Sequence, residues 1–151
     1  NVMAGYFKQP DATAGVFDPD GFFRTGDMGQ MDENGFLSIT GRIKEMLIIS
    51  GENVFPREME EVLNRHPAIS DAAVIGQKDP ARGEVPVAFV ELVEGGAIEL
   101  AEVRAFCRDV LPPYKVPRDI RVLESLPRNP TGKIQRRALR PLLETAGGES
   151  K

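Results

Sequence analysis

The sequence is poor in the residues that build disulfides and metal sites. One cysteine, Cys107, and one histidine, His66, occur among 151 residues. A lone cysteine cannot form an internal disulfide, so nothing demands an oxidising compartment, and we expect a cytoplasmic protein. A lone histidine cannot build a histidine metal cluster or pair with a second one in a relay. We therefore predict no metal site, expect His66 to be a loop residue, and expect Cys107 to pack on the apolar face of a helix.

Long apolar runs and net positive charge are also lacking. No apolar run approaches the roughly 20 residues that span a bilayer, so no integral membrane segment is predicted. The formal net charge of -4 argues against nucleic acid or an anionic membrane as a general partner, because phosphate binding favours a basic face. The first five residues do not resemble a signal peptide, and the chain reads as an excised segment. We expect further catalytic parts upstream.

Turn-forming residues and helical periodicity divide the sequence into three parts. Residues 1–43 are predicted to be strands and turns, because turn sequences at 18–21 and 32–35 bracket apolar residues. From 44 to 140 strands and helices interleave, which predicts an α+β fold in which a sheet carries packed helices. The expected helices are 56–64, 100–111 and a short one around Leu139, and the expected strands are 45–49, 71–75, 87–92 and 120–123. Residues 141–151 are predicted to be a flexible tail.

Basic charge is concentrated near the carboxyl end of this otherwise acidic chain. Five basic residues and no acidic one lie between Arg128 and Arg140. Pro130 and Gly132 predict a tight turn that holds Lys133 on a projecting loop at the start of a helix, where backbone N–H groups favour an anion. On charge alone, a solvated basic loop is the favoured interpretation of the segment.

An ordered set of motifs distinguishes these two interpretations. Pro-Thr-Gly-Lys-Ile at 130–134, followed by a basic pair, resembles the last core motif of the adenylate-forming superfamily. That superfamily contains acyl- and aryl-CoA synthetases, peptide-synthetase adenylation domains and luciferases. Gly26-Asp27 resembles its ribose-binding motif, and residues 41–60 resemble its hinge and lid motif. The resemblance covers residues 5–140 in the family's order and spacing.

The resemblance implies a role for five residues. Lys133 would be the catalytic lysine that neutralises charge at the α-phosphate, Asp27 would bind the ribose hydroxyls, and Arg42 would contact the nucleotide. Lys44 would be the hinge of a mobile lid, and Gly51 would let a thiol pass close to the backbone. From the residues alone, Asp27 could be a turn cap, Arg42 a surface arginine and Lys44 a simple linker position.

The resemblance further implies an AMP-forming acid–thiol ligase that converts a carboxylate, ATP and CoA to acyl-CoA, AMP and pyrophosphate. Residues 1–43 would end its large domain and residues 44–140 would form its lid. ATP or AMP, CoA and Mg would be its cofactors, with the Mg ligands in the missing upstream domain, so that the fragment alone would be inactive. Exposed Lys133 would also be a target for a lysine acetyltransferase.

Three interpretations stay open at this point. The sequence of residues 52–58 favours a fatty-acyl or aryl-CoA ligase. A peptide-synthetase lid and a non-catalytic α+β interaction module are the alternatives. The acyl substrate is not encoded in these residues.

Overall fold

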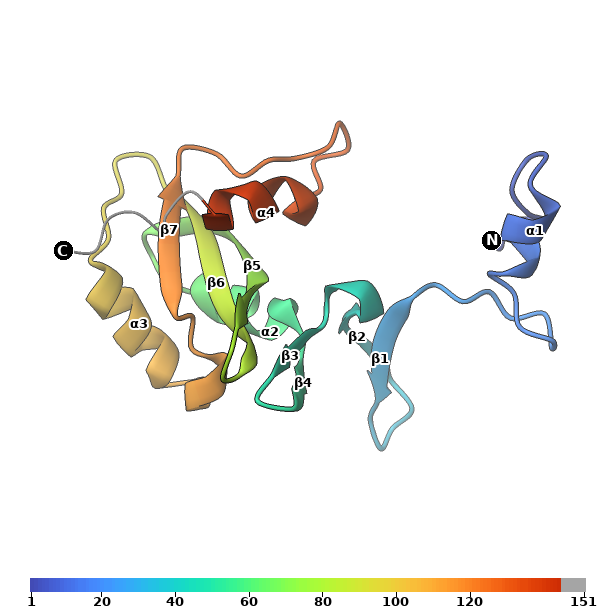
Figure 1. The fold of residues 1–151 in the computed structure, drawn as a ribbon, viewed down its shortest axis with the longest axis horizontal. Helices are drawn as coiled ribbons and strands as arrows, with labels where there is room; N and C mark the ends of the chain where they lie inside the picture. The colour runs from blue at the N-terminus through green and yellow to red at the C-terminus, as the bar shows by residue number, and fades with distance from the viewer. Residues whose placement is uncertain (145–151) are drawn as a thin grey trace. The chain divides into compact units, whose positions relative to one another are not determined.

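The computed structural model describes residues 1–144, which divide after Lys44 into two compact units (Figure 1). The first unit contains a short helix, α1 (Pro10–Ala14), and an antiparallel pair of strands, β1 (Asp27–Met31) and β2 (Leu37–Arg42). A 3-10 turn, η1 (Ile43–Glu45), follows β2. None of the described helices is long and apolar enough to cross a membrane.

The first unit holds less strand than the sequence predicted. The predicted Phe22–Phe23 strand is wrong, because only an isolated bridge between Phe17 and Phe23 forms. The reason lies in Asp18, whose Oδ1 accepts from the N–H groups of Asp20 and Phe22 at 3.0 and 2.8 Å and closes a local turn in place of a ladder. Helix α1 was not predicted. It buries no residue, so it shows no apolar periodicity that could have revealed it.

The second unit is a five-stranded sheet with helices on both faces, which confirms the predicted α+β class. β6 pairs antiparallel with β5 and parallel with β7, and β3 joins β6 at its start and pairs with β4. The elements in chain order are β3 (Leu47–Ile49), β4 (Glu52–Val54), α2 (Pro56–Leu63), β5 (Ile69–Asp79), β6 (Gly83–Leu92), α3 (Leu100–Arg108), η2 (Pro113–Lys115), β7 (Asp119–Leu123) and α4 (Arg136–Glu144).

Two buried clusters lie on opposite faces of this sheet. Alternate residues of β5 and β6 point to each face, since side chains alternate along a strand. One cluster joins Val74 and Val90 to α2 and α3, and the other joins Ile75 and Phe89 to α4. Cys107 belongs to the first cluster, as predicted, and burial raises the pKa of its thiol. Because both faces are covered, β5 and β6 contain continuous apolar runs.

Several element boundaries differ from the predictions, among them that of α3, which ends at Arg108 rather than at residue 111. β5 and β6 form one long hairpin with only residues 80–82 between them, although a longer polar loop was expected. Glu52 and Asn53, predicted to be turn residues, lie in β4, because Ser50 and Gly51 alone make the two-residue turn, with φ of 53° and 87°. The predicted tail starts too early. Residues 141–144 belong to α4, whose apolar face packs on the sheet, and 145–151 lie outside the described residues.

His66 lies in the loop just past α2, as the sequence predicted, and it is 8 % exposed. Its Nδ1 accepts from the Ala68 N–H at 3.3 Å, and its ring meets Phe106 edge-on with centroids 5.3 Å apart. Its contacts are those of a packing residue.

Candidate functional site

Lys133 lies on a tight hairpin rather than at a helix start. Arg128 and Ile134 form an antiparallel bridge, and the Gly132 N–H donates to the Asn129 carbonyl at 2.9 Å. Pro130 occupies the second position of this turn, which favours its fixed φ, and Gly132 follows with a φ of 82°. α4 begins only at Arg136. The expected helix N-terminus beside Lys133 is therefore wrong.

The side chain of Asn129 fixes the turn from inside. Its Oδ1 accepts from the Thr131 N–H at 3.1 Å, the Thr131 hydroxyl at 2.8 Å and the Lys133 N–H at 2.9 Å. The Lys133 N–H is thus already used and is not available to an anion. Its ammonium group, in contrast, has no hydrogen-bond or ion-pair partner within residues 1–144. Sequence reasoning missed Asn129, although Asn-Pro is a turn-initiating pair.

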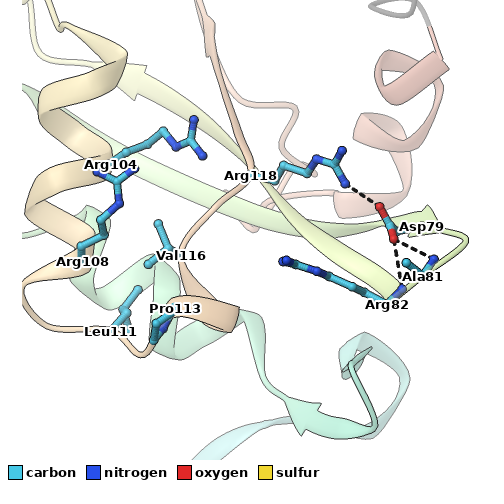
Figure 2. A pocket seen from close by; sticks show the side chains of 9 residues that line it. All are labelled: Asp79, Ala81, Arg82, Arg104, Arg108, Leu111, Pro113, Val116 and Arg118. Atoms are coloured by element: carbon cyan, nitrogen blue, oxygen red, sulfur yellow. Dashed lines mark hydrogen bonds and ion pairs between the residues drawn. The ribbon is translucent and has the colours of Figure 1, made fainter.

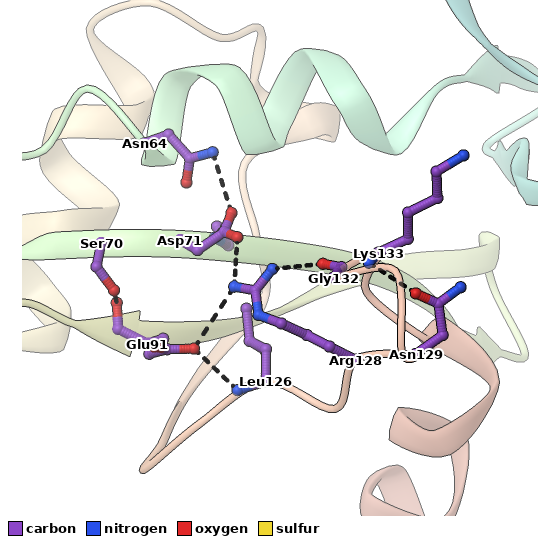
Figure 3. A network of polar contacts seen from close by, with 10 residues as sticks. Asn64, Ser70, Asp71, Glu91, Leu126, Arg128, Asn129, Gly132 and Lys133 are labelled. Atoms are coloured by element: carbon purple, nitrogen blue, oxygen red, sulfur yellow. Dashed lines mark hydrogen bonds and ion pairs between the residues drawn. The ribbon is translucent and has the colours of Figure 1, made fainter.

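Arg128 ties this hairpin to the sheet (Figure 3). Its Nη2 lies 2.6 Å from Asp71 Oδ2 on β5 and 3.7 Å from Glu91 Oε2 on β6, while its Nη1 donates to the Gly132 carbonyl at 3.2 Å. Glu91 also accepts from the Leu126 N–H at 3.0 Å. The hydrogen bond to Asp71 raises the pKa of Arg128. The hairpin is therefore held in place while the Lys133 side chain projects from it.

Asp27 and Arg42 are brought together in the first unit. They are directly opposite in the β1–β2 register, and Arg42 Nε lies 3.0 Å from Asp27 Oδ1. The Asp27 N–H donates to Thr25 Oγ1 at 3.0 Å, which orients the start of β1. Within residues 1–144, no other ion pair or side-chain hydrogen bond uses Asp27 Oδ2 or the remaining guanidinium N–H groups of Arg42. A neighbouring carboxylate and guanidinium can bind hydroxyl donors and phosphate or ribose acceptors side by side.

Lys44 lies at the boundary between the two units, and Gly51 lies in a tight turn with a φ of 87°. Lys44 lies in η1 and is the last residue of the first unit. Gly51 forms the tip of the β3–β4 hairpin, and a Cβ at this position would find no atom within 4 Å, so open space surrounds it. Within the second unit, the β3–β4 hairpin and the loop before α4 lie on different sides (Figure 1). Gly51 belongs to the first of these segments and Lys133 to the second.

A further feature, which no sequence motif revealed, is a cavity lined by four arginines (Figure 2). Its volume is about 590 Å³, and Arg82, Arg104, Arg108 and Arg118 line it from the β5–β6 loop, α3 and the segment before β7. The one carboxylate at the cavity is Asp79, which pairs with Arg118. The N–H groups of Ala81 and Arg82, with Arg118, hold the pKa of Asp79 below its usual value.

The arginine cavity has excess positive charge. Arg104 and Arg108 lie four residues apart on α3, where like charges repel. Within residues 1–144, neither they nor Arg82 form an ion pair, and Arg104 Nε is buried without a hydrogen-bond partner. Clustered, unneutralised guanidinium groups suit a phosphate-bearing ligand. The four residues lie between positions 82 and 118 of an acidic chain, and no single sequence motif contains them.

Comparisons with known proteins place this architecture in one family. The family described as AMP-binding enzyme C-terminal domain matches residues 58–133. The sulfoacetate–CoA ligase of Cupriavidus necator is 47% identical over 136 residues, which are 90% of this chain and 27% of that enzyme. The chain belongs to the AMP-binding enzyme C-terminal domain family, as the motifs predicted.

Solved structures agree with this assignment. The o-succinylbenzoate CoA synthetase of Bacillus subtilis, in complex with its acyl-adenylate intermediate, is 38% identical with a TM-score of 0.86 over 93% of this chain and 28% of that one. The amide bond synthetase McbA from Marinactinospora thermotolerans gives the same identity and TM-score over 93% of this chain and 29% of that one. The chain spans just over a quarter of the length of the curated relatives it matches, 27% for the sulfoacetate–CoA ligase.

Proposed function

We propose that residues 45–144 act as the mobile lid of an AMP-forming acid–thiol ligase and that residues 1–43 belong to the end of its large domain. One observation carries the proposal. Lys133, in the last motif of the family, projects an unpartnered ammonium group from a hairpin that Asn129 and Arg128 hold rigid. A flexible point cation on a fixed support suits a reaction in which negative charge accumulates at one place.

Lys133 would act in the first half-reaction, in which a carboxylate attacks the α-phosphate of ATP and pyrophosphate leaves. Both reactants are anionic, so they repel each other, and charge on the phosphoryl oxygens must be offset as the new bond forms. The Lys133 ammonium group would neutralise both reactants there. Asp27 would accept hydrogen bonds from the ribose hydroxyls through its free oxygen, and Arg42 would hold Asp27 and contact the nucleotide.

The second half-reaction would need a different arrangement of the lid. A thiol attacks the acyl carbonyl and AMP leaves, so Lys133 must withdraw and a path for the thiol must open. Rotation about Lys44 would accomplish both. The β3–β4 hairpin and the loop before α4 lie on different sides of the second unit (Figure 1), which supports this, because one lid can then present a different side in each step. The empty space around Gly51 suits the passage of a thiol.

Two further parts of the proposal concern Mg²⁺ and acetylation. Within the described residues, no group of three or more His, Cys, Asp or Glu side chains could hold a metal ion, so no step here is assigned to Mg²⁺ and its ligands would lie elsewhere. The exposed amine of Lys133 would be accessible to a lysine acetyltransferase, and acetylation would remove its charge. We expect the enzyme to work in the cytoplasm.

The direct test uses the intact protein that carries this chain. Incubated with ATP, Mg²⁺ and a panel of short, fatty and aryl acids, it should release pyrophosphate, and addition of CoA should then yield AMP and thioester in equal amounts. Pyrophosphate release followed by transfer only to an amine or to a carrier-protein thiol would replace the CoA ligase by another member of the superfamily. Absence of pyrophosphate release with every acid would favour the non-catalytic module.

We further propose that the arginine cavity binds the phosphates of CoA. Free CoA carries three phosphate groups, and its binding therefore calls for several guanidinium groups in an otherwise acidic protein. Arg104→Ala should raise the KM for CoA roughly ten- to hundredfold, because a charge-assisted hydrogen bond contributes about 1.5–3 kcal/mol. The adenylation half-reaction, which needs no CoA, should keep its rate.

Dephospho-CoA provides the matched ligand, and Arg137→Ala provides the matched variant because Arg137 is exposed on α4 outside the cavity. The wild-type enzyme should bind dephospho-CoA less tightly than CoA, and Arg104→Ala should narrow that difference. If Arg104→Ala raised the KM equally for both ligands, or if Arg137→Ala raised it as much, the proposal that the cavity binds CoA would be wrong.

A further inference from the structure

Arg136 connects three segments of the second unit that are far apart in the sequence. Its Nη2 donates to both carboxylate oxygens of Glu60 on α2, at 2.8 and 2.7 Å. Its Nη1 lies 3.0 Å from Glu45 Oε2. The Glu60 carboxylate also accepts from the Val74 N–H of β5 at 2.8 Å. One guanidinium group thus links the first residue of the second unit to its core.

The Glu60 end of this linkage is the anchored end. Glu60 is 8 % exposed, and burial raises its pKa while Arg136, the main opposing influence, lowers it. A buried carboxylate stays ionised at neutral pH only when a cation and hydrogen bonds offset the free-energy cost of burying its charge. The planar fork of arginine provides two donor pairs at once, so Arg136 can hold Glu60 with one amino group and Glu45 with the other.

The Glu45 end lies beside Lys44, the residue assigned to the hinge. Glu45 directly follows Lys44, and its side chain is 28% exposed, so the pair is only partly shielded from water. On the other side, Arg136 comes two residues after Ile134, which closes the Lys133 hairpin. Gln135, between them, donates its N–H to the Pro127 carbonyl at 2.7 Å. The connection from Glu45 through Arg136 to Lys133 therefore involves few residues, and hydrogen bonds or ion pairs fix each part of it.

We infer that the Glu45–Arg136 ion pair is a positioning contact. It confines the hinge motion to Lys44 and fixes the Lys133 hairpin relative to the hinge. This inference rests on the proposed function, because it needs a lid that rotates at Lys44. A hinge transmits rotation without loss only when the residue after it is rigidly attached to the moving body. If Glu45 were loose, the rotation would spread into residues 45 and 46, and Lys133 would stop at a less defined position.

Two conservative variants test the ion pair without unfolding the unit. Glu45→Gln removes one charge and leaves Glu60–Arg136 intact, and Arg136→Lys keeps a cation beside Glu60 but cannot reach both carboxylates at once. In the intact enzyme, each should slow adenylation by roughly three- to thirtyfold, which lies within the range of pairwise coupling between contacting residues. The effect on thioester formation from supplied acyl-adenylate should be smaller. The double variant should be no slower than the slower single variant.

Glu61→Gln is the matched control, because it breaks an exposed ion pair between Glu61 and Arg57 on α2 that is remote from this linkage in its contacts. It should leave both half-reactions unchanged. Multiplying effects in the Glu45–Arg136 double variant, or an unchanged adenylation rate in Glu45→Gln, would overturn the positioning role.

Lys44→Pro, assayed in parallel, separates this failure from that of the proposed function. One outcome is that Lys44→Pro slows thioester formation much more than adenylation while Glu45→Gln leaves both rates unchanged. That result would support the hinge and contradict only the positioning contact. If Lys44→Pro affects both half-reactions equally, the hinge is wrong and the positioning role is overturned with it.

Discussion

Replacing Lys133 by alanine in the intact enzyme is expected to slow acyl-adenylate formation roughly 10²–10³-fold, the usual effect of removing one preorganised electrostatic partner from an active site. The reason is local, because the Lys133 backbone is fixed by Asn129 and its ammonium group has no other partner within residues 1–144. Thioester formation from supplied acyl-adenylate should stay near normal, since the proposed rotation would withdraw Lys133 in that step. Separate single-turnover measurements of pyrophosphate and AMP release distinguish the two effects.

Two companion variants sharpen the Lys133 experiment. Arg137→Ala removes an exposed basic residue four positions away in the same segment and should change neither half-reaction. Asn129→Ala keeps the Lys133 charge but removes the three hydrogen bonds that shape its turn, so adenylation alone should fall, by less than in Lys133→Ala. Acetylated Lys133 should behave like alanine. Unchanged pyrophosphate release from Lys133→Ala would show that this lysine serves only solubility.

The parts of the fold that the sequence predicted are those with strong apolar periodicity. α2 and α3 each have a buried face that recurs at helical spacing, and β5 and β6 have continuous apolar runs. Two of the misses, α1 and the turn at Asp18, occur where burial does not decide the conformation. α1 buries nothing, and Asp18 closes a turn with its own carboxylate at a point where a strand was expected. Residues 141–144 join α4 through contacts with distant strands, which local sequence does not reveal.

The same distinction applies to the candidate site. Lys133, Asp27, Arg42, Lys44 and Gly51 could be named because they lie within short ordered motifs. The residues that position them could not. Arg128 finds Asp71 across 57 positions of sequence, and Arg136 finds Glu60 across 76. The cavity arginines are likewise assembled only by the packing of α3 against the sheet. Roles that depend on such long-range pairs need a structure, because no spacing rule connects their members.

Lys44→Pro in the intact enzyme is expected to leave adenylation largely intact and to slow thioester formation roughly 10²-fold or more, as misplacement of reacting groups by about 1 Å does. Proline fixes φ, so the backbone could not make the dihedral change that the rotation requires. It also disfavours the helical conformation of the preceding residue, and Ile43 lies in η1, so the arrangement that survives must be established by a crystal structure of the variant. Lys44→Ala, the control, removes the side chain but keeps the dihedral freedom, and it should change either half-reaction by severalfold at most. Equal losses in both half-reactions of Lys44→Pro, with a normally folded lid, would rule out the hinge.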